Sequence, residues 1–260
     1  LAGGDSGTGR LAEPTEIVAA AHEVLGAATG PDGGDLAGTR FLVTAGGTRE
    51  PICPVRFLGN RSSGRQGHAL AAEAAARGAV VDCVTTHPDS APIGSGIRVT
   101  SVDTAAEMAE AVAGLSVEAD VILMAAAVAD FRPIEVANQK IKKEGGVPEI
   151  RLEPTVDILA TLGRDRLPGQ VLVGFAAETD DLRQNAKAKL QSKGVDLIVA
   201  NDVSVPGVGF GHETNAVVLL DSVGGAVEVP LTDKREVARV VVDAVVNRLR
   251  TNRSLNGDDK

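Results

Sequence analysis

The stretch RFLVTAGGT, residues 40–48, decides the fold class of this chain. Its apolar run is short and ends at two glycines, which is typical of a buried strand followed by a tight turn. A helix is expected further on, because residues 70–75 carry an apolar stripe and Gly78 is a stop signal. A buried strand that leads into a helix is the repeating unit of a parallel α/β sheet.

The rest of the chain repeats this alternation. Further apolar strands are predicted at residues 79–86, 119–130, 170–178 and 195–202. Helical patterns are predicted at residues 104–115, 180–194 and 233–250. A hairpin is predicted by two short strands that flank a pair of glycines, at residues 215–222 and 226–231. The sequence therefore predicts an α/β fold, with a Rossmann-like, mostly parallel sheet, helices on both faces and a β-hairpin region near the C-terminus.

The composition is that of an ordinary globular protein and excludes several kinds of partner. Of the 260 residues, 43% are hydrophobic and 23% are charged. The net charge of −9 argues against nucleic acid and acidic membranes, and no Trp or Tyr is present to stack on bases. No apolar run approaches the ~20 residues of a membrane span, and no signal peptide is visible. Because two cysteines cannot form a disulfide framework, a cytoplasmic location is expected.

The chain divides into one domain and two flanking segments. Residues 1–36 are rich in Gly and Asp around one short helical pattern, so we expect a linker or the tail of a preceding domain. Residues 37–250 hold all the strand and helix patterns of the sheet, and the polar residues 251–260 are expected to be a disordered tail. The first residue is Leu1 rather than Met, so we expect the chain to be part of a longer protein.

Polar or glycine-rich segments follow four of the predicted strands. They read AGGTRE (45–50), AAAVADFRP (125–133), GFAAETD (174–180) and ANDV (200–203). In parallel α/β sheets, ligands bind beyond the carboxyl ends of the strands. One such segment alone is no more than a turn, but four together favour a binding site.

The connection between the first strand and the first helix is unusually long. It runs from Ala45 to Gln66, well beyond the ~2–6 residues that are common, which favours a functional loop. GNRSSG, residues 59–64, has the spacing of a Walker A loop but lacks its Lys-Ser or Lys-Thr. Its polar side chains either cap the helix or mark an anion site at the helix N-terminus, and the backbone amides after the strand are also open to an anion. The candidate residues are Gly46, Gly47, Asn60, Ser62, Ser63 and Gly64.

Carboxylates and lysines supply the other candidate chemistry. Asp130 ends an apolar strand, where a carboxylate is either a metal or ribose ligand or a cap. A lysine cluster at residues 140–143 is either a solvated loop or a polyphosphate clamp, and Lys189 and Lys193 share one helical face. The four histidines lack metal spacing, and no G-x-S-x-G motif is present. The glycine loops, lysines and carboxylates that remain are groups typical of phosphoryl or nucleotidyl transfer.

Five blocks in order resemble the phosphopantothenoylcysteine synthetase family. They are VTAGGTREPICPVRFLGNRSSGRQG, AAAVADFRP, KIKK, VGFAAET and VDLIVANDV, and the match spans about residues 36–250. Residues 4–17 resemble the end of the flavin-dependent decarboxylase half to which bacterial members are fused. The resemblance implies that residues 1–36 are a remnant of that half. It also implies a homodimer, within a larger assembly when the halves are joined.

The resemblance further implies a reaction and its substrates. Members join 4'-phosphopantothenate to L-cysteine with CTP and Mg²⁺ in coenzyme A biosynthesis. The carboxylate attacks the α-phosphate to give an acyl cytidylate and pyrophosphate, and cysteine then displaces CMP. Two alternatives stay open: an NAD(P)-binding reductase and a non-catalytic nucleotide-binding protein. The absence of GxGxxG counts against the first, and the intact lysine loop counts against the second.

Site roles carry over by position. Lys140 would stabilise the triphosphate, and Asn60 would hold the acyl carbonyl for attack by cysteine. The residues implied to contact the nucleotide are Met124, Ala125, Ala126, Asp130, Lys140, Glu153, Pro154, Thr155, Val156, Phe175, Lys189 and Lys193. The loop candidates Gly46, Gly47, Ser62, Ser63 and Gly64 would hold phosphopantothenate with Asn60. One departure concerns this set, since residues 153–159 read EPTVDIL where the family has NPDIL.

Overall fold

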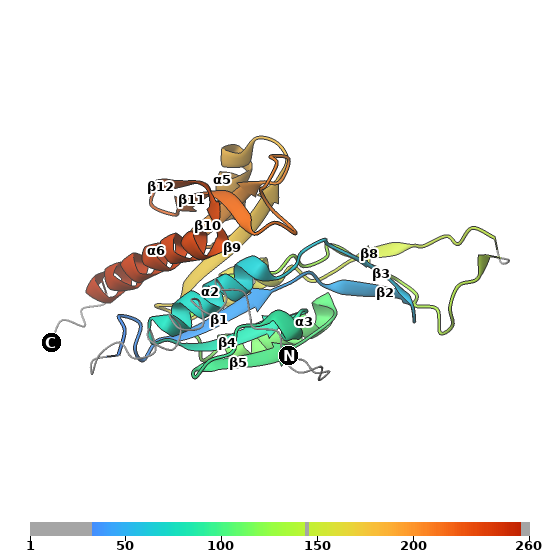
Figure 1. Cartoon of the computed structure of the whole chain (residues 1–260), viewed down its shortest axis with the longest axis horizontal. Coiled ribbons are helices and arrows are strands. Elements are labelled where there is room, and N and C mark those ends of the chain that lie inside the picture. The colour runs from blue at the N-terminus through green and yellow to red at the C-terminus, as the bar shows by residue number, and fades with distance from the viewer. Residues whose placement is uncertain (1–32, 144–145, 256–260) are drawn as a thin grey trace, which may run out of the picture.

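The fold is built on one eight-stranded sheet, shown in Figure 1. The computed structural model describes residues 33–143 and 146–255, so the expectations for residues 1–32 and 256–260 lie outside the described residues. The order of the strands across the sheet is β12-β11-β10-β9-β6-β1-β4-β5. Their bounds are β1 Arg40–Ala45, β4 Val80–Thr85, β5 Ile97–Ser101, β6 Val121–Met124, β9 Val171–Glu178, β10 Leu197–Asp202, β11 Thr214–Asp221 and β12 Ala226–Asp233.

Six of these strands are parallel and reverse their order at one point. From β5 to β10 every neighbouring pair is parallel, whereas β11 and β12 pair antiparallel as the predicted hairpin. Renumbered along the chain, the parallel strands follow the order 3-2-1-4-5-6 of a doubly wound sheet. The reversal lies between β1 and β6, and ligands bind at such a switch point beyond the carboxyl ends. The prediction of a Rossmann-like, mostly parallel sheet is confirmed.

Helices cover both faces of the sheet, and the side chains of β1 alternate between them. Phe41 and Val43 pack in the core under α2 (Arg65–Ala76) and α6 (Lys234–Leu255). Leu42 packs in the opposite core, under α3 (Ala105–Ser116), α4 (Ile158–Asp165) and α5 (Leu182–Lys193). A short 3-10 turn, η1 (Pro88–Ser90), follows β4. In the described part of the chain, no helix combines the length and the apolar character needed to cross a membrane.

Two small strand pairs form an arm that extends away from the sheet, to the right in Figure 1. One pair is the hairpin of β2 (Arg49–Cys53) and β3 (Arg56–Gly59), and the other joins β7 (Phe131–Pro133) to β8 (Leu152–Pro154). The backbone N–H of Ala137 donates to the carbonyl of Ile52 at 3.0 Å, which ties the pairs together. The expected loop between the first strand and the first helix therefore contains this hairpin.

The packed domain reaches further than the expected boundaries at both ends. Leu36, which the sequence assigns to the linker, is 1% exposed and lies in the core under α2 and α6. Its backbone N–H donates to the carbonyl of Arg77 at 3.0 Å. At the other end α6 continues to Leu255, so the first half of the expected tail is helical. At the N-terminal end one apolar residue is added to the core, and at the C-terminal end the helix continues by a few residues.

Close packing of α4 against α5 predicts a large effect from a single methyl group. A Cβ added at Gly163 in α4 would lie 1.8 Å from the carbonyl oxygen of Lys193, at the end of α5. Gly163→Ala must therefore push the helices apart, and we expect a loss of about 1–3 kcal/mol in the free energy of unfolding. Urea unfolding measures it. Gly114→Ala is the matched control, because a Cβ there meets nothing within 4 Å on helix α3. Equal unfolding midpoints for the two variants would contradict this packing.

Candidate functional site

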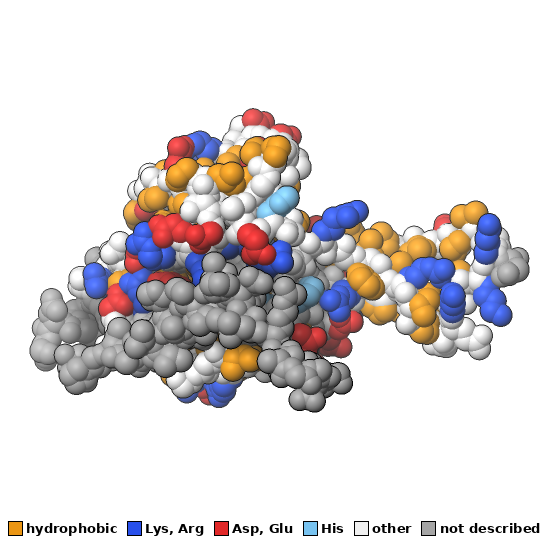
Figure 2. Space-filling view, in the orientation of Figure 1, with side chains coloured by type: hydrophobic (Ala, Val, Ile, Leu, Met, Phe, Trp, Pro, Cys, Tyr) orange, Lys and Arg blue, Asp and Glu red, His pale blue; other side chains and the backbone are white. Residues whose placement is uncertain are grey.

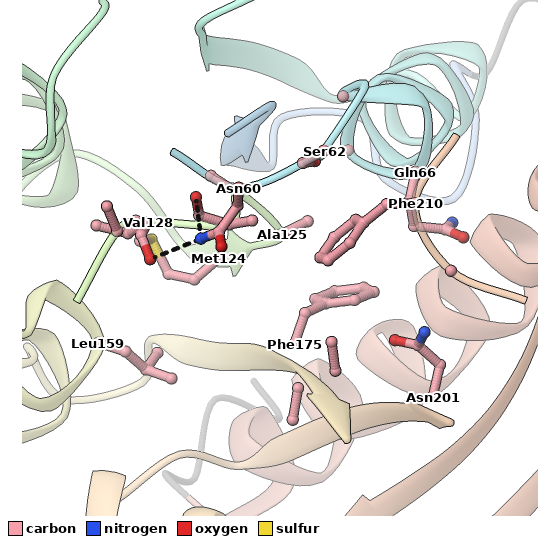
Figure 3. Close-up of a pocket in the computed structure, with 18 of the residues that line it drawn as sticks. Asn60, Ser62, Gln66, Met124, Ala125, Val128, Leu159, Phe175, Asn201 and Phe210 are labelled. Atoms are coloured by element: carbon pink, nitrogen blue, oxygen red, sulfur yellow. Dashed lines mark hydrogen bonds between the residues drawn. The ribbon is translucent and has the colours of Figure 1, made fainter. Parts of the chain in front are cut away.

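A cleft of about 700 Å³ lies at the carboxyl edge of the sheet, on the β10 side of the switch point. The ends of β6, β9 and β10 form its floor, and the loop that precedes α2 and the start of α6 contribute its sides (Figure 3). This volume suits a drug-sized or nucleotide-sized ligand. The strand-end rule applied to the sequence therefore points to the edge at which the cleft lies.

Asn60 is fixed at this cleft by the strand-end backbone. Its side-chain Nδ2 donates to the carbonyls of Ala127 at 3.2 Å and Val128 at 3.3 Å (Figure 3). A Cβ on Gly47 would lie 2.8 Å from the carbonyl oxygen of Asn60, so glycine permits this close approach. Gly46 adopts a φ of 91°, and its carbonyl accepts from the N–H of Ala127 at 2.8 Å. Both glycines lie outside the cleft lining and support the loop from behind.

Helix α2 begins at the cleft without a side-chain cap. The residue before its first turn is Gly64, with a φ of 79°, and no side chain bonds to the first-turn amides. Ser62 and Ser63 line the cleft instead. The structure thus contradicts the capping alternative for this loop and keeps the anion-binding one. No acidic residue lies in the first turn of α2 to offset the positive end of the helix dipole.

The residues after β6 pack against those after β8 to form a second wall. The hydroxyl of Thr155 donates to the carbonyl of Ala129 at 2.5 Å. The backbone N–H of Thr155 donates to the carbonyl of Asp130 at 3.0 Å. This wall contains the candidates Met124, Ala125, Ala126, Asp130, Thr155 and Val156, and also Asp157, Ile158 and Leu159.

Glu153 and Pro154 belong to the arm and do not line the cleft. The Glu153 carboxylate pairs with Arg132 at 2.8 Å across the β7–β8 pair. Of the expected contact set at 153–156, Thr155 and Val156 line the cleft, together with residues 157–159. The first two residues of the set are used by strand β8.

Two phenylalanines face each other across the cleft. Figure 3 shows the ring of Phe175 on β9 opposite that of Phe210, which lies in the connection between β10 and β11. Phe175 is half-buried and packs against the core under α2 and α6, and Phe210 is 40% exposed. Phe210 was not foreseen from the sequence, since one aromatic residue in a glycine-rich loop carries no pattern.

Lys189 and Lys193 both line the cleft from α5, and both are paired with carboxylates. Lys189 Nζ lies 2.7 Å from Glu178 Oε1, and Lys193 forms an ion pair with Asp157. Asp157 also accepts from the N–H of Ala160 at 2.9 Å as the cap of α4. Burial alone would raise the pKa of Asp157, but the bonds from Lys193 and Ala160 hold it below its ordinary value. Each of the two lysines that α5 contributes to the cleft is therefore held by its own carboxylate.

Lys140 lies outside the cleft in this arrangement. It is exposed in the connection between β7 and β8, on the arm, and is absent from the lining. The connection is attached to the arm where Arg56 Nη1 donates to the carbonyl of Ile141 at 3.0 Å. The lysine cluster is therefore a solvent-exposed feature of the arm within one chain.

Lys234, Gln66 and Asn215 complete the far end of the cleft and were missed from the sequence. Lys234 is the first residue of α6 and is only 7% exposed. Its pKa lies below the ordinary lysine value, because burial disfavours the charged form and the Arg65 guanidinium adds repulsion. The charged run DKRE around it looks like a solvated helix start, so no sequence signal identified it. Among the residues that the structure describes, no group of three His, Cys, Asp or Glu could hold a metal by itself.

Comparison with known proteins agrees with the family that the five sequence blocks resemble. Residues 36–249 match the family described as DNA/pantothenate metabolism flavoprotein C-terminal domain. A prokaryotic protein named Cysteine/Cysteine sulfinic acid decarboxylase is 44% identical over 95% of this chain and 68% of its own length. The Coenzyme A biosynthesis bifunctional protein CoaBC of Mycobacterium bovis is 46% identical over 96% of this chain. The chain spans 62% of that relative's length.

A solved structure gives the same match in three dimensions. The crystal structure of the C-terminal domain of a Coenzyme A biosynthesis bifunctional protein CoaBC superposes with a TM-score of 0.71 at 38% identity. It covers 84% of this chain and 98% of that domain. The chain therefore belongs to the DNA/pantothenate metabolism flavoprotein C-terminal family and corresponds to the synthetase half that its ordered sequence blocks resemble.

Proposed function

We propose that this chain joins 4'-phosphopantothenate to L-cysteine in a CTP-dependent reaction. One observation carries the proposal: the cleft unites the Asn60 loop, the segment after β6, Phe175 and the two lysines of α5. These segments are far apart in sequence, and they are the ones that the family resemblance assigns to one reaction. The CoaBC names of the relatives agree with a role in coenzyme A biosynthesis.

The reaction needs two charged substrates to approach each other. A carboxylate oxygen of phosphopantothenate attacks the α-phosphate of CTP, and pyrophosphate leaves. The cysteine amine then attacks the acyl carbon and loses a proton, and CMP leaves with the bonding electron pair. Cations and backbone N–H groups lower the repulsion in the first step and stabilise the charge that develops in both. The lysines of α5 are such cations, and the uncapped N-terminus of α2 offers backbone N–H groups to the anionic acid substrate.

The lysine–carboxylate pairs position the two lysines that α5 contributes to the cleft. Glu178 and Asp157 hold Lys189 and Lys193 in place before a nucleotide arrives. Phosphate oxygens would compete with these carboxylates for the ammonium groups. A lysine already positioned loses less side-chain entropy on binding than a free one.

Mg²⁺ is proposed to enter with the nucleotide. Mg²⁺ is usually held by one or two carboxylates together with substrate phosphates, and it neutralises phosphate charge when bound. Asp130 fits this requirement, since it is exposed on the cleft and no cation lies within 4 Å of it among the described residues. The other carboxylate that lines the cleft, Asp157, is already paired with Lys193.

The arm supports the proposal of a homodimer. Several of its large apolar side chains are exposed, among them Val55 at 59% and Phe57 at 57%. Figure 2 shows apolar and basic side chains together along the arm. Clustered exposed apolar groups mark interaction surfaces, and a second copy of the arm offers the same groups for a symmetric contact. Sedimentation of the chain, compared with that of a Phe57→Asp variant, tests this part.

The central experiment measures pyrophosphate release. With CTP and Mg²⁺ present, we expect release to require phosphopantothenate, and we expect phosphopantothenoylcysteine to form only when cysteine is added. ATP in place of CTP tests nucleotide preference in the same assay. Equal pyrophosphate release without phosphopantothenate would reject the ligase and leave a nucleotide hydrolase.

A further inference from the structure

Lys234 carries a buried charge for which the described chain supplies no carboxylate. It is the only lysine among residues 33–143 and 146–255 that is buried, at 7% exposure. Its ammonium donates to the carbonyl of Gly209 at 3.1 Å, and no carboxylate of the described residues lies within 4 Å of it. An ammonium has three donors and a buried charge is unfavourable unless paired, so this group is poised for an anion.

A hydrogen-bonded ring holds Lys234 at the cleft. Gln66 Nε2 donates to the carbonyl of Lys234 at 3.2 Å, and Asn215 Nδ2 donates to Gln66 Oε1 at 3.4 Å. The ring closes where Gly209 N–H donates to Asn215 Oδ1 at 3.3 Å. All four residues line the cleft, and Figure 3 shows Gln66 on the Phe210 side. The ammonium is therefore fixed in position before any ligand binds.

The charges around this ring also favour an anion. The neighbouring Arg65 donates to the carbonyl of Gly211 at 2.9 Å and pairs with Glu213 at 3.0 Å, so Glu213 is already neutralised. The first turn of α2 has neither a side-chain cap nor an acidic residue. At α6, by contrast, Asp233 caps the helix by accepting from two backbone amides at 2.9 and 2.8 Å. The open helix N-terminus next to Lys234 is thus that of α2.

We propose that this end of the cleft binds a phosphate monoester, with Lys234 as its fixed cation and the first turn of α2 as its amide donors. Resting on the function proposed above, the group is the 4'-phosphate of phosphopantothenate. A phosphate monoester near neutral pH is largely a dianion with three acceptor oxygens, which suits an ammonium together with backbone amides.

The position of Lys234 separates this group from the triphosphate. α2 and α6 cover one face of the sheet, whereas α4 and α5, which carry Lys193 and Lys189, cover the other. The cleft lining therefore includes a cationic group from each side of the sheet. One cationic group serves the nucleotide and the other serves the far end of the acid substrate, so that the reacting carboxylate lies between the two.

The test compares substrates with and without the phosphate. Lys234→Met is assayed with 4'-phosphopantothenate, with pantothenate and with varied CTP, beside Lys187→Met, an exposed lysine on α5 outside the cleft, as the matched control. We expect kcat/KM for phosphopantothenate to fall about 10- to 100-fold, with little change for pantothenate or in the KM of CTP. An equal loss for both acids, or a rise in the KM of CTP instead, would overturn the assignment.

Stability and direct binding exclude a merely structural lysine. Removing an unpaired buried charge is expected to keep or raise the melting temperature, whereas loss of a structural lysine lowers it. Calorimetric titration with phosphopantothenate and with inorganic phosphate gives a readout that needs no turnover. If the wild-type chain fails to ligate but binds phosphopantothenate in a Lys234-dependent way, the anion site stands and the proposed function falls. If neither compound binds more weakly to Lys234→Met, the anion site falls whatever the activity.

Discussion

Replacing Asn60 with Asp is expected to slow ligation about 10²–10³-fold, with the loss concentrated in the capture of the acyl cytidylate by cysteine. Asn60 donates from Nδ2 to the carbonyls of Ala127 and Val128 at 3.2 and 3.3 Å. An ionised Asp only accepts, so its oxygens would face those carbonyls with no hydrogen to share. The same change removes an amide that, by releasing one of these two carbonyls, would donate to the developing acyl oxyanion.

Rapid-quench measurement of the intermediate separates the two steps. The acyl cytidylate should accumulate in Asn60→Asp, because the nucleotide contacts lie on other elements. Asn247→Asp, at an exposed position on α6, is the matched control for the added charge. The melting temperature reports any general damage to the loop. Wild-type capture of the intermediate in the Asp variant would remove Asn60 from the reaction.

Lys140→Gln is expected to lower the single-turnover rate of acyl cytidylate formation by about 10²–10³-fold, with a smaller change in CTP affinity. A cation that stabilises phosphate in transfer acts mainly in the transition state. Because Lys140 is exposed on the arm, the substitution should leave the melting temperature unchanged. Quench-flow with CTP and phosphopantothenate measures the rate, and Lys187→Gln on α5 serves as the control. A wild-type rate would make Lys140 a solvated loop lysine.

Mixing variants tests how Lys140 reaches a cleft that it does not line within its own chain. In a homodimer held by the arms, a mixed dimer of Lys140→Gln and Asn60→Asp chains carries one intact copy of each residue. Activity recovered on mixing means that the arm serves the partner's cleft. No recovery, with each variant inactive alone, means that the lysine loop closes over its own chain.

The fold could be predicted because its signals are local. Runs such as ADVILM and the glycine that ends α5 mark strands and helices by residue type alone, and the alternation of elements then determines the sheet. The loop at Asn60 was found for the same reason, since its length and its serines are visible in the sequence. The arm was not, because β2, β3, β7 and β8 are short strands of three to five residues without clear alternation.

The rest of the site depends on tertiary contacts that the sequence does not display. Lys234 becomes informative only through its burial and its bond to Gly209, and Gln66 only through its contact with the start of α6. Phe210 is identified as a site residue only because its ring faces that of Phe175 on β9. Lys140 shows the opposite case, where a conspicuous sequence motif lies away from the cleft. Burial and distance, rather than residue type, distinguish these positions.

The packing of α2 beside α6 has a consequence for folding during synthesis on the ribosome. Helix α2 ends at residue 76 and α6 starts at residue 234, so 157 residues are synthesised between them. At typical rates of translation this is an interval of about 8–30 s. Until it ends, the apolar surface of α2 and of the strands that packs against α6 lacks this cover, and a growing chain offers it to chaperones or to neighbouring chains. Stop codons placed just before residue 234 should therefore give aggregated rather than merely inactive polypeptide.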